Sequence, residues 1–157
     1  MIDQISAFFT IETIYFWLSF GVLPFWFILI FFPQSKLCGI LATSIFPFLI
    51  LGSVYVYLFY CFFKEGYDFF ENFELYLGIY NLANLFENEA FLILIWTHFL
   101  AINLFCAAWI VRDSQKYFIS KYLNLIPLIA TYFVGPVGII VYWIIRIFFA
   151  KKISLFD

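Results

Sequence analysis

The sequence predicts an all-α integral membrane protein: a four-helix transmembrane bundle with an amphipathic interfacial segment between its second and third helices. Three observations predict this class. Of the 157 residues, 66% are hydrophobic and only 11% are charged, whereas a soluble domain usually carries about 25% charged residues. The charged side chains cluster between long apolar runs. Those runs approach the roughly 20 residues that an α-helix needs to cross a bilayer.

The first two crossings are expected at residues 14–32 and 40–63. The first run contains no charged side chain, and no basic residue precedes it, so we interpret it as a retained transmembrane helix and not as a cleaved signal peptide. Pro24 is expected to kink this helix, because proline removes one backbone hydrogen bond. The second run has Pro47 near its start and ends at Lys64.

Residues 65–89 form the most polar segment of the chain. Phe73, Tyr76 and Tyr80 follow helical spacing within it, which is typical of a weakly amphipathic helix. We therefore place this segment at the membrane interface, lying on the bilayer or dipping shallowly into it. Its carboxylates are expected to form a solvated face and not a metal site, because no histidine joins them.

The third and fourth crossings are expected at residues 90–111 and 122–150. The third ends at Arg112 and Asp113. At about 1.5 Å per residue, the fourth run would exceed roughly 40 Å, so it must tilt, kink or protrude. We expect Gly135 and the proline after it to supply the kink. With no internal repeat, residues 1–157 are predicted to form a single integral membrane domain.

The third predicted helix carries the most informative polar residues. At 100° per residue, His98 shares a narrow stripe with Ile102, Phe105 and Trp109, while Asn103 lies about 140° away from His98. Polar residues at membrane depth are costly and normally face the interior of a bundle, so each is a functional candidate. The alternative for Asn103 is simple interhelical hydrogen bonding.

Gly135 and Pro136 allow two interpretations. They can kink the fourth helix and let it pack closely, or they can widen a pocket in which freed carbonyls and small residues admit a ligand. The aromatic content of 26% suits lipid contact and core packing. A groove lined by flat rings would also suit a long polyene.

Several function classes are excluded by residue type. The net charge of −2 and the absence of a basic stripe argue against a nucleic-acid partner. No lysine lies in mid-membrane for a retinal Schiff base, and one histidine cannot form a bis-histidine haem site or a di-metal cluster. Three cysteines without a C-x-x-C pair predict neither disulfide exchange nor a sulfur metal site: Cys38, Cys61 and Cys106. We therefore predict no metal.

Four ordered features cover nearly the whole chain and together form a fairly specific pattern. They are Leu23-Pro24-Phe25-Trp26 before Phe32-Pro33; Leu77-Gly78-Ile79 before Leu85-Phe86; Trp96-x-His98-Phe99-Leu100-Ala101 with Leu104-Phe105 and Trp109; and Pro127 before Gly135-Pro136-Val137-Gly138 and Tyr142. In this order they resemble the membrane family named for abscisic-acid-deficient four, whose plant plastid member is needed for neoxanthin synthesis.

This resemblance implies a four-helix membrane protein connected with carotenoids. In plants the reaction converts an epoxy-carotenoid into an allenic one, which needs an acid for the epoxide oxygen and a base for a polyene proton. By position, His98 is the candidate acid/base. Asn103 stands where the family usually has an aspartate, so it can orient an oxygen but cannot exchange a proton. Trp96 and Trp109 are expected to pack the end rings, with Trp26, Phe105, Gly135 and Pro136 completing the predicted binding set.

The leading hypothesis is a carotenoid isomerase or accessory protein that binds a carotenoid, as substrate or ligand, among helices one, three and four. The alternative is a non-catalytic subunit that binds pigment or lipid, as a homo-oligomer or within a larger membrane complex. A small transporter is a third class, disfavoured because no charged pair is expected at the midplane. The expected location is a bacterial inner membrane or an organellar, thylakoid-type membrane.

Overall fold

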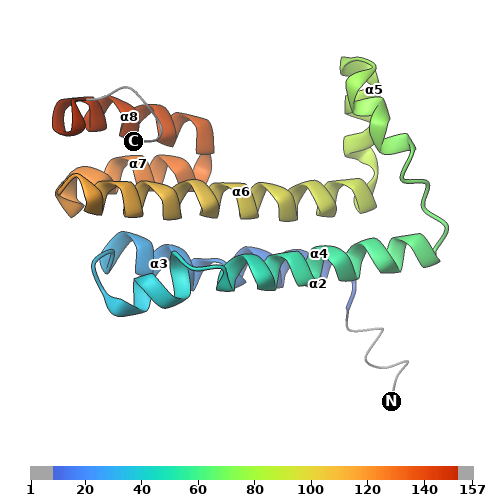
Figure 1. The fold of residues 1–157 in the computed structure, drawn as a ribbon. Helices are drawn as coiled ribbons and strands as arrows, with labels where there is room; N and C mark the ends of the chain where they lie inside the picture. Colours follow the sequence, from blue (N-terminus) through green and yellow to red (C-terminus); the bar gives the residue numbers. More distant parts are fainter. Residues whose placement is uncertain (1–8, 152–157) are drawn as a thin grey trace. The chain divides into compact units, whose positions relative to one another are not determined.

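The computed structural model describes residues 9–151 of the chain (Figure 1). Every regular element in that range is helical and no strand occurs there, so the all-α prediction is confirmed for the described residues. The elements in chain order are α2 (Ile11–Gly21), α3 (Leu23–Phe31), the π-helical turn η1 (Cys38–Ala42), α4 (Phe46–Lys64), the 3-10 turn η2 (Glu71–Tyr76), α5 (Ile79–Glu87), α6 (Glu89–Lys116), α7 (Lys121–Phe133) and α8 (Gly135–Ala150).

The chain divides into two compact units. Unit 1 comprises residues 1–21 and 48–100, and unit 2 comprises residues 22–47 and 101–157. Unit 1 therefore contains α2, most of α4, η2, α5 and the first part of α6. Unit 2 contains α3, η1, the rest of α6, and the pair α7 and α8.

Within residues 9–151, three helical segments are long and apolar enough to cross a membrane. They cover Ile11–Phe31, Cys38–Lys64 and Glu89–Lys116, with 21, 27 and 28 residues, against the roughly 20 that a bilayer requires. These segments are compatible with a multi-pass membrane helical bundle. They correspond to the first three predicted crossings, and α6 continues past Arg112 by about one helical turn.

Prolines lie at the starts of α3 and α4. The predicted crossing at 14–32 is divided into α2 and α3, and Pro24 lies in the first turn of α3. A proline is tolerated there because the first backbone N–H groups of a helix have no intrahelical partner. The carbonyl of Val22 accepts hydrogen bonds from the backbone N–H groups of Phe25 and Trp26, at 3.1 and 3.2 Å. Pro47 is likewise the second residue of α4.

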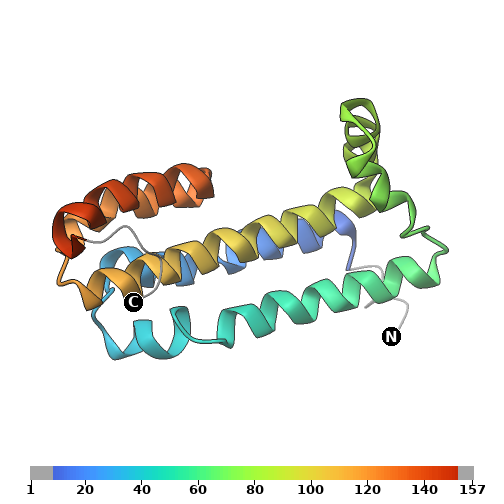
Figure 2. The same ribbon diagram turned by 45° about the horizontal axis from the view of Figure 1, so that its top comes forward.

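The predicted fourth crossing over residues 122–150 is corrected by the structure, because this run is two helices and not one. α7 ends at Phe133, and Val134 (φ −143°, ψ 87°) leaves the helical conformation before α8 begins with Pro136 in its first turn. The two helices fold back on each other within unit 2 (Figures 1 and 2). At 1.5 Å per residue they are about 20 and 24 Å long, each shorter than the roughly 30 Å hydrocarbon core of a bilayer.

Close backbone approach holds this helical hairpin together. A Cβ atom added to Gly138 would lie 2.6 Å from the carbonyl oxygen of Pro127 and would collide with Oγ1 of Thr131. Glycine therefore lets α8 approach α7 closely, and the hydroxyl of Thr131 donates a hydrogen bond to the Pro127 carbonyl at 2.7 Å.

The segment between the second and third long helices is built from η2 and α5 with turns at two glycines. Gly66 and Gly78 have positive φ angles of 82° and 144°, which glycine adopts without steric cost. Asp68 accepts the backbone N–H of Phe70 at 2.8 Å, and Asn88 accepts that of Ala90 at 2.9 Å at the start of α6. Large side chains are exposed along this segment: Phe70, Phe73, Tyr76, Leu77, Ile79 and Tyr80. Its position at a membrane interface stays a prediction.

Candidate functional site

His98 is an exposed residue of α6 in unit 1, between the buried residues Thr97 and Leu100. Thr97 turns its hydroxyl back to donate to the carbonyl of Ile93 at 2.8 Å, so the imidazole is the polar group that this part of the helix presents outward. Within a membrane, such a side chain would be open to a lipid-dissolved molecule approaching from the side.

Asn103 is buried in unit 2, at the turn of the α7–α8 hairpin. Its Nδ2 donates to the backbone carbonyl of Tyr132 at 3.5 Å, which is at the long limit for a hydrogen bond. Tyr132 is the second-last residue of α7, and its carbonyl has no partner within the helix. A Cβ added to Gly135 would collide with Oδ1 of Asn103 and lie 3.3 Å from its Cγ. Asn103 thus contacts the end of α7 and the beginning of α8 together.

Trp26 joins this turn from α3. It is buried, and its ring meets the ring of Tyr132 edge to face, with centroids 5.1 Å apart and planes at 85°. Three residues predicted from the sequence, Trp26, Asn103 and Gly135, therefore converge around Tyr132. The geometry offers one amide side chain, aromatic surface and a glycine whose missing side chain leaves room for the amide.

A buried ionic cluster occupies a second position in unit 2. We define the Asp113–Arg146 cluster as Asp113, Tyr117, Tyr142, Trp143 and Arg146. Oδ2 of Asp113 accepts hydrogen bonds from Nε of Arg146 at 2.7 Å and from the hydroxyl of Tyr142 at 2.6 Å. Nη2 of Arg146 donates to the hydroxyl of Tyr117 at 3.3 Å. The exposed fractions of Arg146 and Tyr142 are only 1% and 0%.

The guanidinium of Arg146 also lies close to two aromatic rings. Its central carbon is 4.8 Å from the ring centroid of Tyr117 and 5.0 Å from that of Trp143, within the range of cation–π attraction. Trp143 in turn stacks on Trp109, with centroids 5.6 Å apart and planes at 9°. This arrangement compensates both buried charges and connects α6 to α8.

This cluster was not predicted from the sequence. Asp113 was placed at the charged end of the third crossing, and Arg146 was given no role within the fourth. The sequence does contain one indication of the cluster: Arg146 lies within the apolar helix Gly135–Ala150. A charge in such a run must find a partner.

The remaining predicted binding residues are dispersed. In unit 1, Nε1 of Trp96 donates to Oγ of Ser19 at 3.1 Å, and the indole lies 5.4 Å from the ring of Tyr15. In unit 2, Trp109 contacts Tyr142 and Trp143. Phe105 and Pro136 are exposed. Within residues 9–151, no group of three His, Cys, Asp or Glu side chains lies close enough to hold a metal ion.

Comparison with known proteins places the chain in a family. The family model described as ABA DEFICIENT 4-like matches residues 13–142, which is most of the chain. The chain belongs to the ABA DEFICIENT 4-like family. The resemblance inferred from the sequence motifs is therefore confirmed.

One curated relative in this family is from Arabidopsis thaliana. The chain is 29% identical over 99 residues to "Protein ABA DEFICIENT 4, chloroplastic", and the alignment covers 61% of this chain and 44% of that protein. The chain thus matches less than half of the length of its relative. No solved structure matches the chain.

The ABA DEFICIENT 4-like match includes most of the residues described above. His98, Asn103, Asp113 and Gly135 lie inside the matched range, whereas Arg146 lies just beyond its end. The hairpin turn, with its close contact between Asn103 and Gly135, is therefore part of the family region of this chain.

Proposed function

We propose that this chain is a multi-pass membrane protein of carotenoid metabolism that binds a carotenoid and acts in its conversion. Its membership of the ABA DEFICIENT 4-like family over residues 13–142 carries this proposal. The three apolar helical segments support a location in a bacterial inner membrane or a thylakoid-type membrane. A carotenoid is an apolar polyene, so it reaches such a protein through the lipid.

The geometry of the hairpin turn in unit 2 supports a role in binding. Trp26 and Tyr132 provide aromatic surface, and Asn103 adds an amide that can both donate and accept hydrogen bonds. Its bond to the Tyr132 carbonyl is long at 3.5 Å, so exchanging it for a bond to a ligand oxygen costs little. Asn103 is the proposed donor to an oxygen of the pigment.

In the catalytic form of the proposal, the chain is a carotenoid isomerase. Opening an epoxide to an allene requires a proton for the epoxide oxygen and removal of a proton from the polyene. His98 is the proposed acid/base, because an imidazole can both give and take a proton near neutral pH. Its exposure on α6 supports this role.

A second candidate is a non-catalytic pigment- or lipid-binding subunit, either in a homo-oligomer or in a larger complex. It is favoured by two further polar groups on α6. Asn103 cannot exchange a proton, and the carboxylate of Asp113 is already bound by Arg146 and Tyr142. A ligand held by either group would therefore not be transformed by it.

Pigment analysis after expression in carotenoid-producing cells distinguishes the two forms. The carotenoid pool and the pigment that copurifies with the chain are identified by chromatography and mass spectrometry. An isomerase changes the pool, and a His98→Ala variant abolishes the change while retaining pigment and fold. Ile102→Ala, another exposed position of α6, is the matched control and should convert like the parent.

Three outcomes are informative. Equal conversion by the parent and His98→Ala refutes catalysis by His98. Copurified pigment with an unchanged pool supports the binding subunit. A chain that neither changes the pool nor retains any carotenoid contradicts the proposal in both forms.

A further inference from the structure

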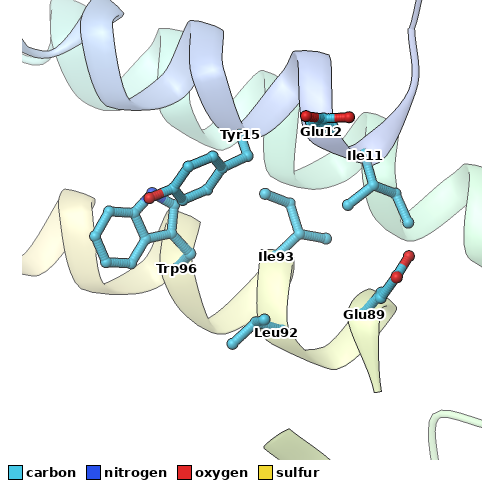
Figure 3. A pocket seen from close by; sticks show the side chains of 7 residues that line it. All are labelled: Ile11, Glu12, Tyr15, Glu89, Leu92, Ile93 and Trp96. Atoms are coloured by element: carbon cyan, nitrogen blue, oxygen red, sulfur yellow. The ribbon is translucent and has the colours of Figure 1, made fainter. Parts of the chain in front are cut away.

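Unit 1 contains a cavity of about 580 Å³ between the beginnings of α2 and α6 (Figure 3). This volume lies in the range of about 300–1,000 Å³ that is usual for small-molecule sites. Of its lining residues, only Trp96 belongs to the set predicted for pigment binding. The cavity therefore calls for a separate explanation.

One end of the cavity is aromatic and held in place. Figure 3 shows Tyr15 of α2 beside Trp96 of α6, with ring centroids 5.4 Å apart. The indole of Trp96 is fixed by its hydrogen bond to Ser19 at 3.1 Å and by stacking on Phe99 at 5.5 Å. A fixed ring presents binding surface with little loss of conformational entropy.

The other end of the cavity is acidic. Glu12 lies in the first turn of α2, and Glu89 is the first residue of α6. In Figure 3, Glu89 lies at the end of the cavity away from Trp96, and Glu12 lies on α2 between Ile11 and Tyr15. Negative side chains are favoured at helix N-termini by the helix dipole. No basic side chain occurs among the described residues that line the cavity, so the lining itself offers no cation to these carboxylates.

Aliphatic side chains connect the two ends. Leu92 and Ile93 lie between Glu89 and Trp96 on α6 and line the same cavity. Trp96 follows Glu89 by seven positions, which corresponds to about 10 Å along the helix. Both apolar segments, Ile11–Phe31 and Glu89–Lys116, begin at the acidic end. The cavity thus runs from the polar ends of two membrane-spanning segments into their apolar part.

We propose that this cavity binds an amphiphile with an alkylammonium head and an apolar body. The head lies at Glu12 and Glu89, where charge complementarity favours a cation. The body lies on Leu92 and Ile93 and ends against Tyr15 and Trp96. Two sources share this chemistry: the ethanolamine or choline headgroup of a phospholipid, and a free long-chain amine.

The test uses the purified full chain in nonionic maltoside micelles with octyltrimethylammonium as the probe. Saturable binding is expected, measured by calorimetry and by the change in tryptophan fluorescence. Glu12→Gln together with Glu89→Gln should weaken binding about tenfold, equivalent to about 1.4 kcal/mol. Glu87→Gln is the matched control, because Glu87 is an exposed carboxylate two residues before Glu89 that does not line the cavity. It should bind the probe like the parent.

Further measurements make the result decisive. The single variants Glu12→Gln and Glu89→Gln should each weaken binding, and thermal unfolding in micelles shows whether each variant is folded. Uncharged 1-octanol should bind more weakly than the cationic probe. The proposal is overturned if octanol binds as tightly as the probe, if the folded double variant binds it unchanged, or if Glu87→Gln weakens binding equally.

Competition identifies the source of the ligand. Phosphatidylcholine added to the micelles displaces the probe if a lipid headgroup occupies the cavity, whereas diacylglycerol with the same acyl chains does not. Lack of displacement by either lipid assigns the cavity to a free amine. Equal displacement by both lipids means that acyl chains occupy the cavity, and it contradicts the proposal. Because none of these measurements reads carotenoid conversion, failure here is separate from failure of the proposed function.

Discussion

Individual side-chain contacts provide hydrogen-bond partners for polar groups buried inside unit 2. An unpaired polar group in an apolar environment costs several kcal/mol, and Asn103 and Asp113 avoid that cost through long-range contacts. Asn103 reaches Tyr132 across 29 residues of sequence, and Asp113 reaches Arg146 across 33. These contacts also explain why α6 can carry polar groups in an otherwise apolar helix.

The contact between Asn103 and Gly135 predicts that Gly135→Ala destabilises the protein. The added Cβ meets Oδ1 of Asn103, and overpacking of this kind costs about 1–3 kcal/mol. The free energy of unfolding in micelles measures the effect. Gly52→Ala in α4 is the matched control, because its Cβ meets no atom within 4 Å, so its effect should stay within about 1 kcal/mol. Equal destabilisation by both variants would contradict this interpretation of Gly135.

The Asp113–Arg146 cluster predicts strong coupling between its two charges. Arg146→Met alone or Asp113→Leu alone leaves one buried charge without compensation, which costs about 3–5 kcal/mol. The double variant removes both charges, so it should lose much less stability than the sum of the singles. A double-mutant cycle by thermal or denaturant unfolding measures the difference. Arg112→Met, at the exposed neighbouring position, should leave stability unchanged, and additive single effects would show that the charges do not interact.

Among the helices, the α7–α8 hairpin is the main departure from a simple four-crossing bundle. Pro136 cannot continue a helix from α7, because it lacks a backbone N–H, and Gly138 lets α8 pack against Thr131. The two helices are too short to span the hydrocarbon core individually. The hairpin therefore brings the start of α7 and the end of α8 to the same end of unit 2 (Figure 2).

This arrangement predicts that both ends of the hairpin are accessible from one side of the membrane. In a background lacking the three native cysteines, Lys121→Cys and Lys151→Cys should react with a membrane-impermeant maleimide in the same vesicle orientation. Right-side-out and inverted vesicles provide the comparison. Lys36→Cys, in the connection after α3, serves as a positive control for labelling. Reaction of the two hairpin positions from opposite sides would show that residues 122–150 cross the bilayer once.

The whole protein exposes apolar surface that is suited to contact with lipid acyl chains and not with water. Only 28% and 22% of the residues in the apolar windows of the first two membrane segments are buried inside the structure. The exposed residues there include large aromatic side chains such as Phe16, Trp17 and Phe27. Exposed apolar area of this extent is stable when acyl chains cover it and promotes aggregation in water.

We therefore expect the chain to stay in the membrane pellet after washing with alkaline carbonate or high salt, and to enter solution only with detergent. The physical reason is that burial of apolar surface in lipid does not depend on ionic strength or on protein charge. Detection of the tagged chain in each fraction measures this. Release by carbonate alone would refute membrane insertion.

The membrane class, the positions of the first three long helices and the family follow from the sequence by itself, because they depend on properties read along the chain. Apolar run length identifies a segment that can span a bilayer, and the ordered motifs identify the ABA DEFICIENT 4-like family. Pro24 was expected to kink one helix, whereas it begins a second one, α3. The placement of His98 and Asn103 on different faces of one helix follows equally from helical periodicity.

The tertiary structure alone decided the hairpin, the Asp113–Arg146 cluster and the cavity at Glu12 and Glu89. Each depends on contacts between residues that are distant in sequence. The sequence of an apolar run does not indicate whether the run forms one straight helix or folds back as two. The role of Arg146 was not evident from the sequence because its partner, Asp113, lies 33 residues away. Asn103 was a candidate from its residue type alone. Its contact with Gly135 at the start of α8 is visible only in the tertiary structure.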